Sequence, residues 1–174
     1  MRKRRNSIES IVIDNAKIND PSSIKSEAVN FFRKIFHEDH HQRTTFSNLD
    51  FKTLTSEQAV KFTVEFSIDE IDQAVASCDN FKAPGPDGFN FKFIKSSWEV
   101  IKYDLYALIN EFWESSRLPR GSNSAFVVLN QKIDNPSGFK DFRHISVMGS
   151  IYEIIAKLLT RCLQCVMESL IVPQ

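Results

Sequence analysis

Two prolines and two glycines crowd into the seven residues from Lys82 to Gly88, which read KAPGPDG. Proline fixes φ and has no backbone N–H, whereas glycine readily adopts positive φ, so neither a helix nor a strand can continue through this run. The run therefore predicts a rigid loop that separates the regular elements on either side of it. Its composition alone assigns it no chemistry.

Capping residues mark two helix starts before this loop. Asp20 followed by Pro21 is typical of an N-cap and a first helical position, and apolar residues then recur at helical spacing to about His37. Ser67 with Glu70 three residues later is a capping-box signature. It predicts a second helix that ends at the loop.

After the loop, apolar residues at steps of three and four predict a helix over about 97–115 and a last helix over about 150–170. The partly β-branched run 125–129 predicts a strand, and residues 141–148 are expected to be extended. Residues 38–66 show no clear period, so we interpret them as a connector.

Composition favours a packed core but not a free-standing nucleic-acid-binding protein. Hydrophobic residues make up 42% of the chain and charged residues 25%, which argues against wholesale disorder. The 22 basic residues balance 22 acidic ones, whereas a nucleic-acid binder usually carries a basic excess. Residues 1–20 are interpreted as a basic tail with a short apolar segment. Its run Arg2-Lys3-Arg4-Arg5 fits a nuclear-import signal, a phosphate-binding arm or a plain tail.

Cysteine usage and the length of apolar runs predict an intracellular protein without a membrane span. The odd number of cysteines, Cys78, Cys162 and Cys165, does not indicate a disulfide framework. The basic start is not followed by the apolar run of a signal peptide. The longest apolar stretches have about five residues, far fewer than the roughly 20 that span a bilayer. We therefore expect a reducing compartment, either the nucleus or the cytoplasm.

Two short runs carry metal-ligand residue types. They are His37-Glu38-Asp39-His40-His41 and Cys162-x-x-Cys165. Neither run has a partner cluster that would complete the four ligands of a zinc site. We expect a solvated loop for the first, half-buried thiols for the second, and no metal site at either.

Two cations flank a predicted strand and return segment. Lys132 follows the strand, and Arg143 lies in the segment that returns after a turn at Asn135-Pro136-Ser137-Gly138. If both side chains face the same way, they can hold a polyphosphate, with arginine as a fork and lysine as a point charge. The alternative is two ordinary surface cations.

At this point a set of motifs in fixed order resembles a known family. The motifs are KAPGPDGFNFKFIK, a Trp98-to-Asp104 spacing, RLPRG, FVVLNQKIDNP, KDFRHISVMGSIYEIIAKLLTRCL and ESLIVPQ. Together they resemble the reverse transcriptases of plant LINE-type (non-LTR) retrotransposons, over the whole chain.

The resemblance implies an α+β, predominantly helical fold that forms part of the fingers subdomain of a right-hand polymerase. Residues 1–66 then correspond to a basic tail, connector helix and linker upstream of the polymerase, and residues 67–174 to the N-terminal part of the reverse transcriptase domain. The parent activity is RNA-templated DNA synthesis with Mg²⁺, and the parent's partners are an RNA template and a DNA primer.

The resemblance also implies roles for individual cations. Lys132 and Arg143 match the segment that helps to bind the triphosphate of the incoming nucleotide. The KAPGPDG turn and the helices around it match a region near the template and the fingertips. We therefore assign Lys82, Lys92 and Lys95 to nucleic-acid contacts.

Departures from the family pattern lower the expected activity. The family usually has Ile-Pro where this chain has Asn130-Gln131, and Pro where it has His144. A buried, unpaired Asn130 amide would cost about 1–3 kcal/mol. Polymerases hold two metal ions on palm aspartates, including an adjacent Asp-Asp pair, and none of the 174 residues forms such a pair.

These departures lead to three readings of the chain. Its last residue, Gln174, matches a point where the family continues into the palm. The main prediction is a truncated or decayed polymerase fragment that lacks palm and thumb, has no catalytic residue or cofactor of its own, and self-associates through surfaces that a palm would cover. The alternatives are a weak nucleic-acid-binding module and a non-functional remnant.

Overall fold

The structure is a computed structural model that describes residues 8–38 and 52–170. Its contacts divide the chain into two compact units. Unit 1 combines Met1–Ser47 with Val127–Ser146, and unit 2 combines Asn48–Phe126 with Val147–Gln174. Each is described by itself.

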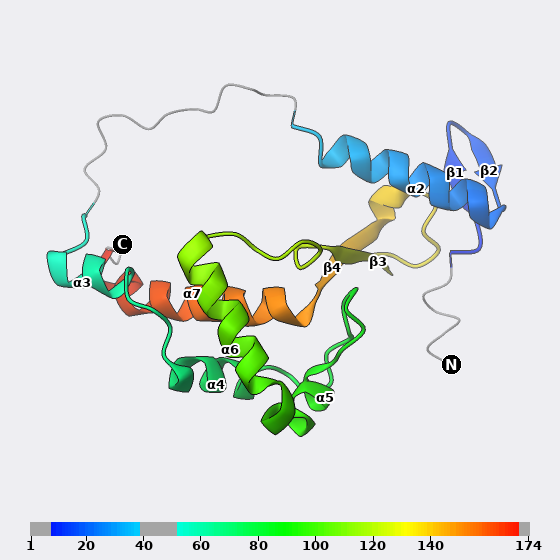
Figure 1. Cartoon of the computed structure of the whole chain (residues 1–174). Helices are drawn as coiled ribbons and strands as arrows, with labels where there is room; N and C mark the ends of the chain where they lie inside the picture. The colour runs from blue at the N-terminus through cyan, green and yellow to red at the C-terminus, as the bar shows by residue number, and fades with distance from the viewer. Residues whose placement is uncertain (1–7, 39–51, 171–174) are drawn as a thin grey trace. The chain divides into compact units, whose positions relative to one another are not determined.

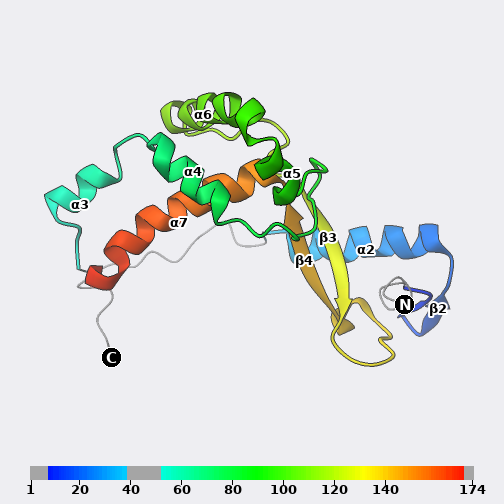
Figure 2. The same ribbon diagram turned by 90° about the horizontal axis from the view of Figure 1, so that it is seen from below.

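Helices and strands alternate irregularly along the chain (Figures 1 and 2). The elements are β1 (Ile11–Ile13), β2 (Ala16–Ile18), α2 (Pro21–Ile35), α3 (Ser56–Lys61), α4 (Ile68–Ala76), α5 (Phe91–Ser96), α6 (Trp98–Ser115), β3 (Ala125–Gln131), the 3₁₀ helix η1 (Phe139–Asp141), β4 (Phe142–Met148) and α7 (Ser150–Leu170). Strand β1 pairs with β2 and strand β3 with β4, giving two two-stranded sheets.

Unit 1 begins with a hairpin where the sequence predicted only a tail with an apolar segment. Strands β1 and β2 are antiparallel, with Ile11 opposite Ile18. Asp14 and Asn15 form the turn at positive φ, which these two residue types tolerate better than most. The strands have three residues each, too few to show a period in the sequence.

The predicted start of the next helix is confirmed. The side chain of Asp20 accepts a hydrogen bond from the backbone N–H of Ser23 at 2.8 Å, and Pro21 is the first residue of α2. The helix ends at Ile35, close to the predicted end at His37.

The core of unit 1 joins segments that are distant in sequence. Its buried residues are Ile11, Ile24, Phe139 and Phe142. The backbone N–H of Val12 also donates to the Ser137 carbonyl at 2.7 Å. Half of these buried side chains come from the β3–β4 region, so the division between the units differs from the predicted boundary after residue 66.

Unit 2 is built on α4 and α7, with α5 and α6 packed beside them (Figure 2). Its buried side chains are Ile71, Ala74, Val75, Cys78, Phe91, Ile94, Ile109, Ile154, Ile155 and Leu158. The Ser67–Glu70 capping box is confirmed, since each side chain bonds the other's backbone N–H. The helices predicted over 97–115 and 150–170 are α6 and α7.

Two short helices of unit 2 were not predicted. Helix α3 lies inside the supposed connector 38–66, and its own capping box, Thr55 with Gln58, was the signal that marked it. Helix α5 begins after Asn90, whose side chain accepts from the N–H of Phe93 at 2.9 Å. Each has only six residues, fewer than two turns, so no amphipathic period can develop.

The predicted strand and extended segment are confirmed as β3 and β4. Nearly every position of β3 is exposed, including Asn130. The expected desolvation cost of this amide therefore does not arise, because its side chain is not buried.

A hydrogen bond connects α6 to α4. The Tyr106 hydroxyl donates to Asp72 Oδ1 at 2.5 Å. Burial, followed by this bond to the carboxylate, raises the pKa of Tyr106 to about 12. An unfolded tyrosine titrates near pH 10. Between about pH 10 and 12 the unfolded chain therefore loses this proton while the folded chain keeps it, so the bond's stabilisation is complete below pH 10 and is lost as pH rises.

We expect Tyr106→Phe to flatten the fall in the unfolding free energy of unit 2 between pH 10 and 12. Urea midpoints followed by tryptophan fluorescence at each pH measure this fall. Tyr103→Phe is the control, since Tyr103 is 68% exposed and none of the described hydrogen bonds includes its hydroxyl. Equal slopes for wild type and Tyr106→Phe would contradict the prediction.

Candidate nucleic-acid interface

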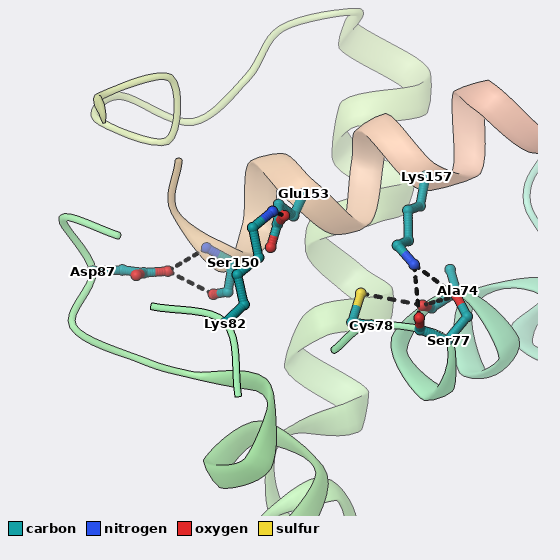
Figure 3. Close-up of polar contacts among 8 residues, drawn as sticks. All are labelled: Ala74, Ser77, Cys78, Lys82, Asp87, Ser150, Glu153 and Lys157. Atoms are coloured by element: carbon teal, nitrogen blue, oxygen red, sulfur yellow. Dashed lines mark hydrogen bonds and ion pairs between the residues drawn. The ribbon is translucent and has the colours of Figure 1, made fainter. Parts of the chain in front are cut away.

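The KAPGPDG loop is bound to the start of α7 (Figure 3). Asp87 Oδ2 accepts hydrogen bonds from the backbone N–H and the hydroxyl of Ser150, at 2.5 and 2.6 Å. The residue before Ser150 is Gly149, which has no side chain to cap the helix. Asp87 supplies the cap from 63 residues away, and its negative charge is favourable at a helix N-terminus.

Glycines allow the loop and the helix start to approach this closely. Gly85 is buried, and a Cβ at this position would lie 2.2 Å from the Met148 carbonyl oxygen. A Cβ on Gly149 would lie 3.2 Å from Asp87 Oδ2. Gly85 therefore allows the close approach because it has no side chain. The atoms that a side chain would meet are backbone atoms of Met148 and Gly149, which cannot rotate away.

Two of the three lysines assigned to nucleic-acid contacts are engaged within unit 2. Lys82 forms an ion pair with Glu153 of α7 (Figure 3). Lys95 Nζ donates to the carbonyl oxygens of Ala76 and Cys78, at 2.8 and 2.7 Å. Lys92 is exposed on α5. Of this set, Lys92 has the ammonium group that is most available to a ligand.

Two further cations from α7 reach the same end of α4, and the sequence reasoning missed them. Lys157 Nζ donates to the Ser77 carbonyl at 2.8 Å (Figure 3), and Arg161 donates to the Gln73 carbonyl at 3.3 Å. They are spaced i, i+4, so they lie on one face of the helix. This spacing was the available signal.

The charges gathered here act on a buried thiol. Burial raises the pKa of Cys78, while the charges of Lys157 and Lys95 oppose the shift. Its Sγ donates to the Ala74 carbonyl at 3.3 Å. Lys95 and Lys157 also donate to carbonyl groups at the carboxyl end of α4, where the helix dipole is negative, so their charges stabilise this helix end.

The predicted nucleotide contacts lie in unit 1, at the end of the β3–β4 sheet. The backbone N–H of Lys132 donates to the carbonyl of Asp141 at 2.8 Å. Asp141 precedes Arg143 by two residues. Lys132 Nζ also donates to the Lys140 carbonyl at 3.0 Å. Arg143 is exposed on β4. Lys132 thus lies directly after β3 and Arg143 lies on β4, as the sequence predicted.

Asp141 orders the loop between these strands. It accepts from the backbone N–H groups of Gly138 and Ser137, both at 2.9 Å, and these bonds lower the pKa of Asp141. The neighbouring Lys132 adds to the effect. The carboxylate is therefore occupied inside its own loop.

His144, at the position where the family that the sequence resembles usually has proline, lies inside β4 and contacts aromatic rings at the end of α2. Its ring lies edge-on to Phe32 and Phe36, with centroids 5.7 and 6.1 Å apart. His144 therefore contributes aromatic contacts within unit 1.

The metal-type runs do not assemble a site among the described residues. Within residues 8–38 and 52–170 no group of three or more His, Cys, Asp or Glu side chains could hold a metal ion. His37 and Glu38 are exposed, and the rest of that run lies outside the described part of the chain. Burial raises the pKa of Cys162, and Cys165 is exposed.

Comparison with known proteins relates the chain to a transposon-encoded protein. No protein-family model matches it. It is similar to the Transposon TX1 uncharacterized 149 kDa protein of Xenopus laevis, with 24% identity over 162 residues. The match covers 92% of this chain but 12% of that protein, so the chain spans a small part of the relative's length. In the described parts of the chain, no helix combines the length and apolarity of a membrane span.

Proposed function

We propose that the chain is part of a LINE-type (non-LTR) retrotransposon reverse transcriptase, comprising the segment before the polymerase and part of its fingers. The parent reaction is RNA-templated DNA synthesis with Mg²⁺. The observation that carries this proposal is the similarity to a transposon-encoded protein along 92% of the chain. The ordered motifs that resemble a reverse transcriptase are the reason for proposing this activity in particular.

The arrangement of the motifs is consistent with this role. The KAPGPDG loop is held rigidly on α7 by Asp87 and Gly85, as a loop near a template requires. The exposed Arg143 has the fork geometry that binds a triphosphate, and Lys132, directly after β3, is hydrogen-bonded through its backbone to Asp141, two residues before Arg143. Mg²⁺ would be held by palm aspartates in the parent enzyme, and these 174 residues contain no adjacent Asp-Asp pair to do so.

The proposal includes partner surfaces on unit 2. Helix α7 exposes Leu159, Leu163 and Met167 by 44%, 51% and 40%. We propose that this stripe packs against a palm in the parent enzyme. The 174-residue chain without a palm then self-associates through the stripe, because exposed apolar patches promote association.

A chimeric polymerase tests the function. The whole chain, with both units, replaces the matching segment of an active LINE-type polymerase, and incorporation on a poly(rA)/oligo(dT) template is measured with Mg²⁺. We expect synthesis from the chimera and none above a heat-killed control from the 174-residue chain alone. Arg143→Ala in the chimera should raise the KM for dTTP by about 10- to 100-fold, the value of one charge-assisted contact.

The control for the chimera is Lys102→Ala. Lys102 lies on α6 of unit 2 and forms an ion pair with Glu99 at 2.5 Å, whereas the predicted nucleotide contacts belong to unit 1. The Lys102→Ala substitution should leave the KM of the chimera for dTTP unchanged. A folded chimera that shows no synthesis, or a KM for dTTP that Arg143→Ala leaves unchanged, would count against the proposed function.

A further inference from the structure

Unit 2 contains a pocket of about 280 Å³ whose wall includes two aromatic rings, Phe89 and Phe93. Aliphatic side chains of α5, α6 and α7 form most of the remaining wall. Two polar residues also line it, Asp104 of α6 and Ser150 at the start of α7. A mostly apolar pocket with a few polar groups is the usual form of a small-ligand site.

The two rings form a flat, exposed stack. Their centroids are 5.2 Å apart and their planes differ by 15°. Phe89 is 50% exposed and Phe93 is 51% exposed, so each ring leaves about half of its surface to solvent. A stacked aromatic pair of this kind offers a surface on which a planar ring of a ligand can stack.

Both rings are held by the backbone contacts that fix the loop. Asp87 Oδ1 accepts from the N–H of Phe89 at 3.4 Å, while the other carboxylate oxygen of Asp87 binds Ser150. Asn90 caps α5 by accepting from the N–H of Phe93 at 2.9 Å. The pocket wall is therefore preorganised, which lowers the entropic cost of binding.

The polar groups of the pocket are hydrogen-bond acceptors. Asp104 is exposed, and among the described residues no hydrogen bond or ion pair includes its carboxylate. An ionised carboxylate only accepts. The Ser150 hydroxyl uses its proton on Asp87, so it too offers lone pairs to the pocket. A complementary ligand is a planar ring that carries N–H donors along one edge.

We propose that this pocket binds a nucleobase of single-stranded nucleic acid, with the base stacked on Phe89 and Phe93 and its N–H edge against Asp104. Guanine fits best, because its N1–H and 2-amino group are adjacent donors that match the two oxygens of a carboxylate. Lys92, exposed on α5 between the two phenylalanines in sequence, supplies a cation for a neighbouring phosphate. This inference rests on the proposed function, since it names how the loop region binds a template strand.

Binding of labelled heptaribonucleotides to the full chain tests the site. Fluorescence anisotropy is followed with UUUGUUU, UUUAUUU, UUUCUUU and UUUUUUU at one fixed salt concentration. We expect the guanine-containing heptamer to bind tightest. Asp104→Asn should remove this preference, because an amide offers only one acceptor oxygen. Phe93→Leu should weaken binding of all four heptamers about tenfold, the loss expected for one stacked base.

Glu111→Gln is the matched control, because Glu111 is exposed on the same helix but does not line the pocket. It should change none of the four affinities. Asp104 is exposed, so Asp104→Asn keeps the inference testable if Phe93→Leu disturbs the fold. Equal affinity for all heptamers in wild type, insensitivity to Asp104→Asn, or no binding at all would overturn the inference. The proposed function is judged separately, by synthesis from the chimera.

Discussion

Gly85→Ala is expected to lower the unfolding free energy of unit 2 by about 3 kcal/mol, the upper end of the range for overpacking a tight site. A Cβ at this position would lie 2.2 Å from the carbonyl oxygen of Met148 and 2.6 Å from the N of Gly149. Both atoms are backbone, so relief requires the start of α7 to move away from the loop. Such a movement would also weaken the bonds between Asp87 and Ser150.

The measurement is the urea midpoint of tryptophan fluorescence. Both tryptophans, Trp98 and Trp113, lie in α6, so the signal reports on unit 2. Gly88→Ala is the matched control, because Gly88 lies in the same loop at φ +76° and has open space around its Cβ position. It should cost only the strain of a left-handed residue, about 1 kcal/mol. A loss for Gly85→Ala no larger than for Gly88→Ala would contradict the steric argument.

Asp87→Ala is expected to cost about 2–4 kcal/mol of unfolding free energy. It removes the only side-chain cap of α7 in the described part of the chain, worth about 1 kcal/mol by itself. It also leaves the N–H and hydroxyl of Ser150 without this acceptor, and Ser150 is 7% exposed. A buried donor without a partner adds about 1–3 kcal/mol to the loss.

Asp87→Asn should cost less, about 1 kcal/mol, because the amide oxygen can still accept while the charge at the helix N-terminus is lost. Asp79→Ala is the control. Asp79 accepts from the N–H of Phe81 two residues on, as Asp87 does from Phe89, but this contact is exposed and local. Tryptophan fluorescence in urea again gives the free energies. Similar losses for Asp87→Ala and Asp79→Ala would show that the contact to Ser150 contributes little.

Helix boundaries in this chain follow from short-range rules. Asp20 with Pro21, and Ser67 with Glu70, marked their helices because a cap acts within three residues of the helix start. The range predicted for α7 agrees with the structure because its apolar stripe runs for 21 residues without interruption. Helices α3 and α5 were missed because six residues cannot show a period.

The candidate site was predictable only in part. The sequence placed Lys132 directly after a strand and Arg143 in the segment that returns, and the structure has them there. It also offered Lys95 as a nucleic-acid contact, whereas its ammonium group binds the carboxyl end of α4. Whether a surface lysine serves a ligand or a helix end depends on which carbonyl groups lie within reach, and local sequence carries no information about that.

Local sequence therefore dictates where this chain bends and where its helices begin, since torsional preference and capping depend on near neighbours. Which distant groups meet is settled only in three dimensions. The first N–H of α7 needs an acceptor, and Gly149 beside it has no side chain to offer one. Asp87 supplies it because buried Gly85 lets the loop reach the helix start. The same approach positions Phe89 at the pocket, as a consequence of packing that no short-range pattern encodes.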